Sequence, residues 1–174
     1  MSMEDCSSKG PGLIVARFQR WILVAVALAA PLGAEQHSNG YLFVAPGGLT
    51  GPARTNATVH LGVGGELALP KGFGVGAELG ALGPTDNFAD VLGVFSANGY
   101  YHFLRRSGKL DPFATAGYSL FFRNGRANLF NFGGGMNYWF LSRVGFRGEI
   151  RDHVYWNADA TLHYWGVRFG LAFR

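Results

Sequence analysis

Charged residues are scarce in this sequence of 174 residues, where Asp, Glu, Lys and Arg together make up 15%. A soluble domain of this size usually carries about 25%. The hydrophobic fraction of 48% is ordinary, so the unusual feature is missing surface charge. The net charge of +4 is dispersed, with no basic run longer than Arg105-Arg106. We therefore expect no nucleic-acid partner, because binding to nucleic acid needs clustered positive charge.

Cysteine and metal-ligand motifs are scarce as well. Cys6 is the only cysteine and lies in a segment that we expect to be removed, which excludes internal disulfides and cysteine-based metal sites from the mature chain. The five histidines are scattered and form no metal-spaced group such as H-E-x-x-H. The Gly-x-Gly runs lie inside predicted strands, where glycine indicates crowding, and not in a phosphate-binding loop. The sequence therefore predicts neither a metal nor another cofactor.

The N-terminal segment has the layout of a secretory signal peptide. Arg17 and Arg20 precede an apolar stretch at 21–32, and small residues follow as far as Ala34. A membrane-spanning helix is the alternative interpretation, but it needs about 20 apolar residues and this stretch is shorter. We predict a signal peptide at 1–34 and a single domain at 35–174.

Apolar residues alternate with small or polar ones in short segments of the mature chain. In the last segment, Trp165, Val167, Phe169, Leu171 and Phe173 share one face, and small or basic residues occupy the other. This period of two residues predicts a strand. The eight predicted strands are 41–45, 59–69, 73–80, 91–103, 112–122, 130–140, 144–153 and 165–173. Short connections and an even strand number predict an all-β, eight-stranded antiparallel up-and-down barrel.

The predicted connections contain turn residues. Pro46-Gly47-Gly48 is predicted to end the first strand, Pro70-Lys71-Gly72 to form a tight reversal and Asn124-Gly125 a two-residue hairpin turn. A loop that contains Trp156 and Asn157 is expected before the last strand. The loops are about a dozen residues or fewer, so one copy is not expected to form a large adhesive interface.

Alternation alone does not say which face of the barrel is inside. A soluble, lipocalin-like barrel would enclose a ligand with its apolar face and expose its polar face to water. Here the second face is mostly Gly, Ala, Ser and Asn, which suits the interior of a narrow eight-stranded barrel better than a water-facing surface. Aromatic residues also cluster near strand ends, as expected at two membrane interfaces. The clusters are Tyr100, Tyr101 and Phe103; Phe121 and Phe122; Tyr138, Trp139 and Phe140; and Tyr155 and Trp156. These features favour a transmembrane β-barrel.

Three stretches and the C-terminal strand resemble the small outer-membrane β-barrel family, whose best-known type is the OmpA transmembrane domain. The stretches are Pro112-Phe-Ala-Thr-Ala-Gly-Tyr118, Phe132-Gly-Gly-Gly-Met-Asn-Tyr138 and Val144-Gly-Phe-Arg-Gly-Glu-Ile-Arg-Asp152. The resemblance covers nearly the whole mature chain. It implies a monomer in contact with the lipid of the outer membrane of a Gram-negative-type bacterium.

The resemblance also implies a role for the last strand. Its apolar face looks like the signal that the barrel-assembly machinery reads in this family. The residues that would form this signal are Trp165, Val167, Phe169, Leu171 and Phe173. Arg174 departs from the usual final aromatic residue of the family.

Charged and imidazole side chains fall on the predicted inner face of the barrel. They are His60, Glu66, Glu78, His102, Arg147, Glu149, Arg151 and Arg168. These residues line either a polar channel or a plug of ion pairs. We favour the plug, because an eight-stranded lumen leaves little space for water and buried charges must be paired.

The sequence therefore predicts an outer-membrane barrel with a structural or general envelope role and no enzymatic activity. The alternatives are a small porin-like channel, a lipid A-modifying hydrolase and a secreted lipocalin-like barrel. A hydrolase needs a nucleophile beside a base. The residue types are supplied by His60, His102, Ser96, Ser119, Glu66 and Glu78, but no serine lies two residues from a histidine, as neighbours on one face of a strand would.

Overall fold

The computed structural model describes residues 38–51, 55–86, 90–103, 108–157 and 160–174. The predicted signal peptide at 1–34 lies outside the described residues. The strands are β1 (Asn39–Thr50), β2 (Thr55–Ala68), β3 (Phe73–Pro84), β4 (Leu92–His102), β5 (Leu110–Phe122), β6 (Arg126–Trp139), β7 (Val144–Asn157) and β8 (Ala160–Phe173). The 3₁₀ turn η1 (Pro70–Gly72) connects β2 to β3.

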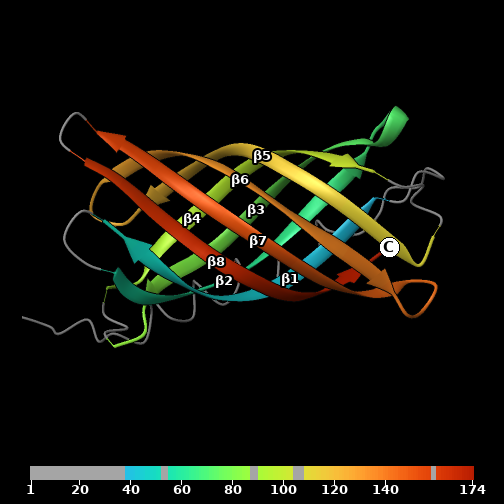
Figure 1. Ribbon diagram of the computed structural model, residues 1–174, viewed down its shortest axis with the longest axis horizontal. Helices are drawn as coiled ribbons and strands as arrows, with labels where there is room; N and C mark the ends of the chain where they lie inside the picture. The colour runs from blue at the N-terminus through green and yellow to red at the C-terminus, as the bar shows by residue number, and fades with distance from the viewer. Residues whose placement is uncertain (1–37, 52–54, 87–89, 104–107, 158–159) are drawn as a thin grey trace, which may run out of the picture. The chain divides into compact units, whose positions relative to one another are not determined.

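The strands form a closed barrel in chain order (Figure 1). Each strand pairs antiparallel with the next, and β8 pairs antiparallel with β1, which confirms the predicted eight-stranded up-and-down barrel. The strands are inclined to the long axis of the barrel (Figure 1) and contain 11 to 14 residues. A tilted strand needs about 9–11 residues to cross a bilayer. Within the part of the chain that the structure describes, no helix is long and apolar enough to cross a membrane.

The outer surface of the barrel is apolar. Leu61 on β2 and Phe169 on β8 expose 52% and 46% of their surface, whereas their neighbours His60 and Arg168 expose 5% and 3%. The predicted alternation is therefore confirmed, with the apolar face outward. The lipocalin-like alternative is wrong, because it requires the apolar face to line the interior.

β1 continues past the point where the sequence predicted its end. The strand includes Pro46, Gly47 and Gly48, so the predicted break is wrong. The pairing of β1 with β8 skips Ala45 and Pro46, of which the proline has no N–H to donate, and resumes at Gly47 opposite Gly166. A Cβ atom on Gly47 would collide with the carbonyl oxygen of Trp165. Glycine here permits the close approach of β8 and does not end the strand.

The predictions for two connections between strands have different outcomes. The tight reversal between β2 and β3 is confirmed, with Lys71 in the left-handed region at φ 64°. The loop predicted around Trp156 and Asn157 is wrong, because β7 extends through both residues. The Trp156 ring is 62% exposed on the outer surface and stacks at 6.3 Å from Phe130 of β6, so it extends the apolar outer face.

The hairpin predicted at Asn124-Gly125 forms between β5 and β6, but its turn is longer than expected. Phe122 pairs with Arg126, which leaves three residues in the connection. Neither Asn124 nor Gly125 has a positive φ. A two-residue type I′ turn requires positive φ at both central residues, so the predicted two-residue turn is wrong.

Neighbouring aromatic residues near strand ends divide between the two faces. Tyr101 and Tyr138 are 42% and 44% exposed on the outer surface, but their neighbours Tyr100 and Trp139 are buried in the lumen. Phe121 is buried there too. The expectation that these clusters lie at the membrane interfaces is therefore wrong for Phe121 and Trp139, because successive side chains of a strand point to opposite faces.

The outward position of Phe169, near the middle of β8, generates a test of the membrane-facing surface. We expect Phe169→Arg to lower the free energy of unfolding in lipid by about 2–4 kcal/mol, because the guanidinium must enter hydrocarbon. Leu141→Arg, in the turn between β6 and β7, is the matched control and should cost about 0–1 kcal/mol. Urea titrations of both variants in lipid vesicles measure the difference. Equal costs would contradict the assignment of this surface to the bilayer.

Candidate functional site

The lumen of the barrel is filled by polar and charged side chains. Among the described residues, the buried side chains with charged or imidazole groups are His60, Glu66, Glu78, His102, Asp111, Arg147, Glu149, Arg151, His153 and Arg168. We call these residues, with the Tyr, Ser and Asn side chains that bond to them, the lumen network. It is the candidate site of the protein, because it gathers the chemically reactive side chains in one place.

Glu78 on β3 is the carboxylate at the centre of the lumen network. Its Oε1 accepts hydrogen bonds from the hydroxyls of Tyr41 at 2.7 Å and Tyr100 at 3.3 Å. Its Oε2 accepts from Arg151 and Arg168, each at 2.9 Å. Four donors thus satisfy both oxygens of this buried carboxylate, and two of them carry the positive charge that it requires.

Glu149 on β7 is the second carboxylate among the arginines. Its Oε2 accepts from Arg147 Nε at 3.2 Å and Nη2 at 3.0 Å. Its Oε1 forms an ion pair with Arg151 and lies 3.7 Å from Arg168 Nη1. Arg147 and Arg151 are two residues away on the same strand, and Arg168 is directly opposite on β8. The parity of two adjacent strands therefore places three guanidiniums around one carboxylate.

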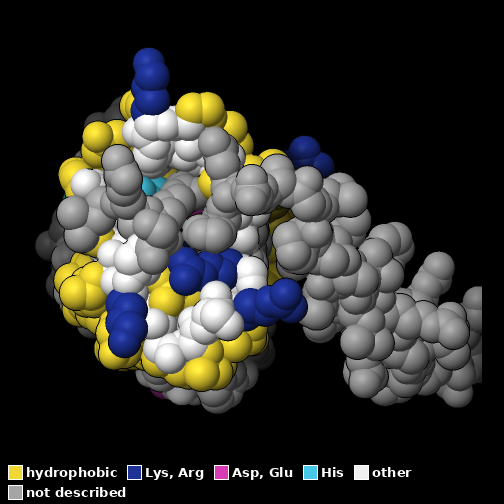
Figure 2. All heavy atoms as spheres, turned by 90° about the vertical axis from the view of Figure 1, so that its right-hand side faces the viewer, with side chains coloured by type: hydrophobic (Ala, Val, Ile, Leu, Met, Phe, Trp, Pro, Cys, Tyr) yellow, Lys and Arg dark blue, Asp and Glu magenta, His cyan; other side chains and the backbone are white. Residues whose placement is uncertain are grey.

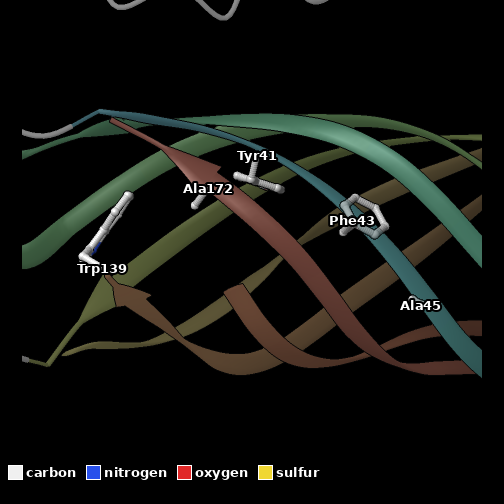
Figure 3. Close-up of a cluster of buried hydrophobic side chains, with 5 residues drawn as sticks. All are labelled: Tyr41, Phe43, Ala45, Trp139 and Ala172. Atoms are coloured by element: carbon white, nitrogen blue, oxygen red, sulfur yellow. The ribbon is translucent and has the colours of Figure 1, made fainter. Parts of the chain in front are cut away.

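Aromatic rings cover the faces of the guanidiniums. The Arg147 guanidinium carbon lies 4.2 Å from the centroid of the Tyr41 ring and 4.0 Å from that of Phe113, and Arg168 lies 4.3 Å from that of Phe43. Tyr41 and Phe43 project from β1 as successive inward residues (Figure 3). Gly64 on β2 makes space for the Tyr41 ring, which a Cβ atom there would meet at 2.6 Å. These cation–π contacts stabilise charges that have left water.

His102 links two further carboxylates. Its Nε2 lies 2.7 Å from Glu66 Oε1 and its Nδ1 lies 2.6 Å from Asp111 Oδ1. An ionised carboxylate only accepts hydrogen bonds, so between two ionised carboxylates both ring nitrogens would donate and the ring would be an imidazolium. Asn137 bridges this group to the arginines, since it donates to Asp111 Oδ2 at 3.1 Å and accepts from Arg147 at 3.3 Å.

The charges of the lumen network balance once His102 is an imidazolium. The four carboxylates are matched by four cations, and His60 and His153 add no charge as neutral rings. The carboxylates are Glu66, Glu78, Asp111 and Glu149, and the cations are His102, Arg147, Arg151 and Arg168. A neutral interior avoids the large cost of an uncompensated charge in a low-dielectric environment.

Ser119 and His153 form the only serine–histidine contact within the described residues, which the sequence reasoning missed because it compared residues on one strand. Ser119 Oγ lies 3.0 Å from His153 Nδ1. On the other side of the ring, Arg168 Nη2 lies 3.2 Å from Nε2, and arginine only donates. Nε2 is therefore the acceptor, and Nδ1 carries the proton and points it at the serine.

This tautomer prevents His153 from acting as a base toward Ser119. A general base must present an unprotonated nitrogen to the hydroxyl that it activates. Ser119 Oγ also accepts from Asn131 at 2.9 Å and shares a hydrogen bond with Ser96 Oγ at 2.8 Å, so its bonding capacity is filled. Its side chain is fully buried. The arrangement is a structural hydrogen-bond network and does not resemble an activated nucleophile.

Apolar and aromatic groups cover the network toward both ends of the barrel. Near the β5–β6 hairpin, Leu82, Val94, Phe121 and Leu129 form a buried cluster. At the opposite end, which carries the C-terminus (Figure 1), Trp139 is buried and the Arg174 guanidinium lies 4.3 Å from the centroid of its ring. Arg174 Nε also donates to the carbonyl oxygen of Ser142 at 3.0 Å. This unusual last residue thus packs over the indole at the mouth of the lumen.

The C-terminus-bearing end of the barrel is rich in exposed cations. Lys71, Lys109 and Arg143 lie in or beside its turns and are exposed. Figure 2 views this end and shows Lys and Arg side chains distributed over it. Their charges are in contact with solvent and are separate from the balanced charges of the lumen.

All eight side chains of the predicted lumen set are buried inside the barrel. The set lacked Asp111, because the sequence placed the start of that strand at Pro112, and β5 begins at Leu110. It also lacked His153, although the alternation had placed that residue on the inner face. Tyr41 and Tyr100 were missed as ligands of Glu78, because nothing in the sequence indicates which strands face each other across the lumen.

The predicted assembly-signal residues of β8 lie on the outer face of the barrel. Trp165, Phe169, Leu171 and Phe173 are 40–46% exposed, and Val167 is half-buried. These residues lie beside β1, at the seam that closes the barrel. Recognition by the assembly machinery stays a prediction.

In the described part of the chain, no group of three or more His, Cys, Asp or Glu side chains is arranged to hold a metal ion.

Comparison with known proteins identifies the fold. No family model matches the chain, and no curated protein matches its sequence. Among solved structures, it is similar to the N-terminal β-barrel domain of Pseudomonas aeruginosa OprF, with a TM-score of 0.58 and 16% identity over 79% of this chain and 97% of that one. It is also similar to Neisserial surface protein A, with a TM-score of 0.61 and 9% identity over 78% of this chain and 96% of that one.

The outer membrane protein OprG from Pseudomonas aeruginosa is a third similar structure, with a TM-score of 0.53 and 8% identity over 81% of this chain and 97% of that one. Identities this low establish a likeness of fold alone. The chain has the fold of the small eight-stranded outer-membrane β-barrels, as the resemblance in its sequence predicted.

Removal of Glu149 tests the importance of charge balance in the lumen. We expect Glu149→Ala to lower the free energy of unfolding by about 3–5 kcal/mol, because it leaves buried guanidiniums without their partner. The matched control is Asp90→Ala, which removes an exposed ion pair with Arg123 of 2.8 Å and should cost about 0–1 kcal/mol. Urea unfolding in detergent measures both. Equal losses would contradict the burial of the Glu149 carboxylate among cations.

Proposed function

We propose that this protein resides in the outer membrane as a non-conducting β-barrel with a structural role in the cell envelope. The observation that carries the proposal is the charge-balanced and hydrogen-bonded network that fills the lumen. The apolar outer face would contact lipid, and the terminal strand would be read by the barrel-assembly machinery during insertion. One copy forms a closed barrel by itself, so a monomer suffices for this role.

A filled lumen argues against the porin-like alternative. Conduction would require ions to pass Glu78, Glu149 and the guanidiniums that bind them, which occupy the same cross-section of the barrel. Breaking one such buried pair costs about 3–5 kcal/mol. Eight strands leave an interior just wide enough for side chains, so the network has no space into which it could withdraw.

The hydrolase alternative lacks support from the site. The serine–histidine contact lies inside the lumen network, with the histidine proton directed at the serine oxygen. A lipid substrate would have to reach a fully buried hydroxyl from the outer face of the sheet. The structural role therefore accounts for the buried Ser119 and His153 without invoking a reaction.

The proposed location can be tested by fractionation and gel mobility. We expect the protein in the outer-membrane fraction, and an unboiled sample should migrate differently from a boiled one on a denaturing gel. The closed barrel has no free strand edge, so detergent alone should not open it. Recovery of a detergent-free, soluble monomer would contradict the proposal.

The closed lumen can be tested by electrical recording. Purified protein reconstituted in planar bilayers should produce no sustained single-channel current, because paired side chains obstruct the lumen. A 16-stranded porin, whose wide lumen holds an aqueous channel, serves as the positive control. Large and steady currents from the wild-type protein would overturn the non-conducting assignment, whatever its cellular location.

A further inference from the structure

Exposed charges are divided unequally between the two ends of the barrel. At the end that carries the C-terminus, three exposed cations lie on three different connections, and we call them the basic rim: Lys71, Lys109 and Arg143. The carboxylates on the nearby strand ends, Glu66 and Asp111, are each only 2% exposed and belong to the lumen network. No side-chain carboxylate of the described residues is therefore exposed beside the basic rim.

The opposite end of the barrel exposes charges of both signs. Arg123 and Arg126 lie at the β5–β6 connection, and Asp86 and Asp90 lie at the β3–β4 connection. Arg123 Nη1 donates to Asp90 Oδ1 at 2.8 Å. Among the described residues, two exposed cations are thus matched by two exposed carboxylates at this end, whereas the three cations of the basic rim are matched by none.

The basic rim lies at the border of the apolar outer face. Each of its three cations is within two residues of an exposed apolar side chain in the sequence. These apolar neighbours are Phe73, Leu110 and Leu141, which expose 53%, 48% and 59% of their surface. Long Lys and Arg side chains keep their charged ends in a polar medium while their stems cover apolar surface. In a bilayer that contacts the apolar face, the charged ends would therefore lie at the level of the headgroups.

The cations of the basic rim are spread around the barrel and do not surround one point. They lie on the β2–β3, β4–β5 and β6–β7 connections, and successive connections at this end are two strands apart in the closed sheet. Each strand occupies about 5 Å in the direction of the hydrogen bonds. Figure 2 shows Lys and Arg side chains at separate positions on this end. This spacing suits several small anions, each beside one cation, better than one compact ligand.

We propose that the basic rim binds the headgroups of anionic phospholipids, such as phosphatidylglycerol, in the leaflet at the C-terminus-bearing end. The inference rests on the proposed membrane location and deepens it, because it gives one leaflet a preferred lipid charge. Lys and Arg side chains near a bilayer surface attract anionic lipids, and a zwitterionic headgroup has no net charge for them to attract. The opposite end, whose exposed charges cancel, would have no such preference.

The preference can be measured by electron spin resonance with spin-labelled lipids. The protein is reconstituted in phosphatidylcholine vesicles that contain a trace of labelled phosphatidylglycerol or labelled phosphatidylcholine, and the spectra give the fraction of label that the protein immobilises. We expect the wild-type protein to associate with labelled phosphatidylglycerol more strongly than with labelled phosphatidylcholine, by about two-fold or more. Sodium chloride at about 1 M should reduce this preference, because salt screens exposed charges.

Variants of exposed residues assign the preference to one end of the barrel. The triple variant Lys71→Gln/Lys109→Gln/Arg143→Gln should lose about half or more of the preference for phosphatidylglycerol, because each substitution removes one cation at headgroup level. It should immobilise as much labelled phosphatidylcholine as the wild-type protein, since the apolar outer face is unchanged. Arg126→Gln is the matched control, which removes an exposed cation from the opposite end and should keep the full preference.

Three results would overturn the proposal. They are equal association of the wild-type protein with both labelled lipids, a preference that the triple variant retains in full, and a loss in Arg126→Gln equal to that in the triple variant. None of these results would bear on the membrane location. A protein that immobilises neither labelled lipid would instead contradict the proposed function, so the two failures are distinguishable.

Discussion

Pairing of buried charge is the constraint on which the rest of the interior depends. Three arginines lie inside a bore with space for side chains only, and a guanidinium does not lose its proton to escape burial. Glu78 and Glu149 must therefore be present, and each must be reached by more than one cation. The tyrosine hydroxyls complete the hydrogen bonding of the Glu78 carboxylate. Aromatic rings cover the faces of the guanidiniums that the carboxylates do not contact.

The network also connects strands that are not neighbours in the sheet. Glu78 on β3 bonds to Arg151 on β7 and Arg168 on β8, across the lumen and 73 and 90 residues away in the chain. These contacts exist only when the sheet has curved far enough to bring β3 opposite the last two strands. The ion pairs thus stabilise the closed barrel in addition to the β1–β8 pairing, which is interrupted at Ala45 and Pro46.

The alternation of side chains between the two faces of a strand explains which parts of the structure could be predicted from the sequence and which could not. Alternation determines which side chains point inward, so Glu149 and its three arginines could be placed together from two adjacent strands. It does not determine which strands meet across the lumen, so the Tyr41–Glu78 bond and the Ser119–His153 contact were invisible. The predicted strand ends were wrong where a residue type that is usual in turns lies inside a strand for another reason. Gly47 is an example, because it permits the close approach of β8 at the β1–β8 seam.

The apolar outer face and the charged interior depend on each other. In water, the ion pairs of the lumen would be weakened by a high dielectric constant and by salt, as exposed pairs are. In the proposed location, lipid around the barrel would exclude water from the outer face of the sheet, so the interior pairs would act in a medium where pairing is strong and mispairing is costly. The same medium favours the exposed leucine and phenylalanine side chains of the outer face, which would destabilise a soluble protein as a contiguous patch. The proposed membrane location thus accounts for both faces of each strand, because the alternation in the sequence matches an apolar environment outside the barrel and a paired, charged one inside.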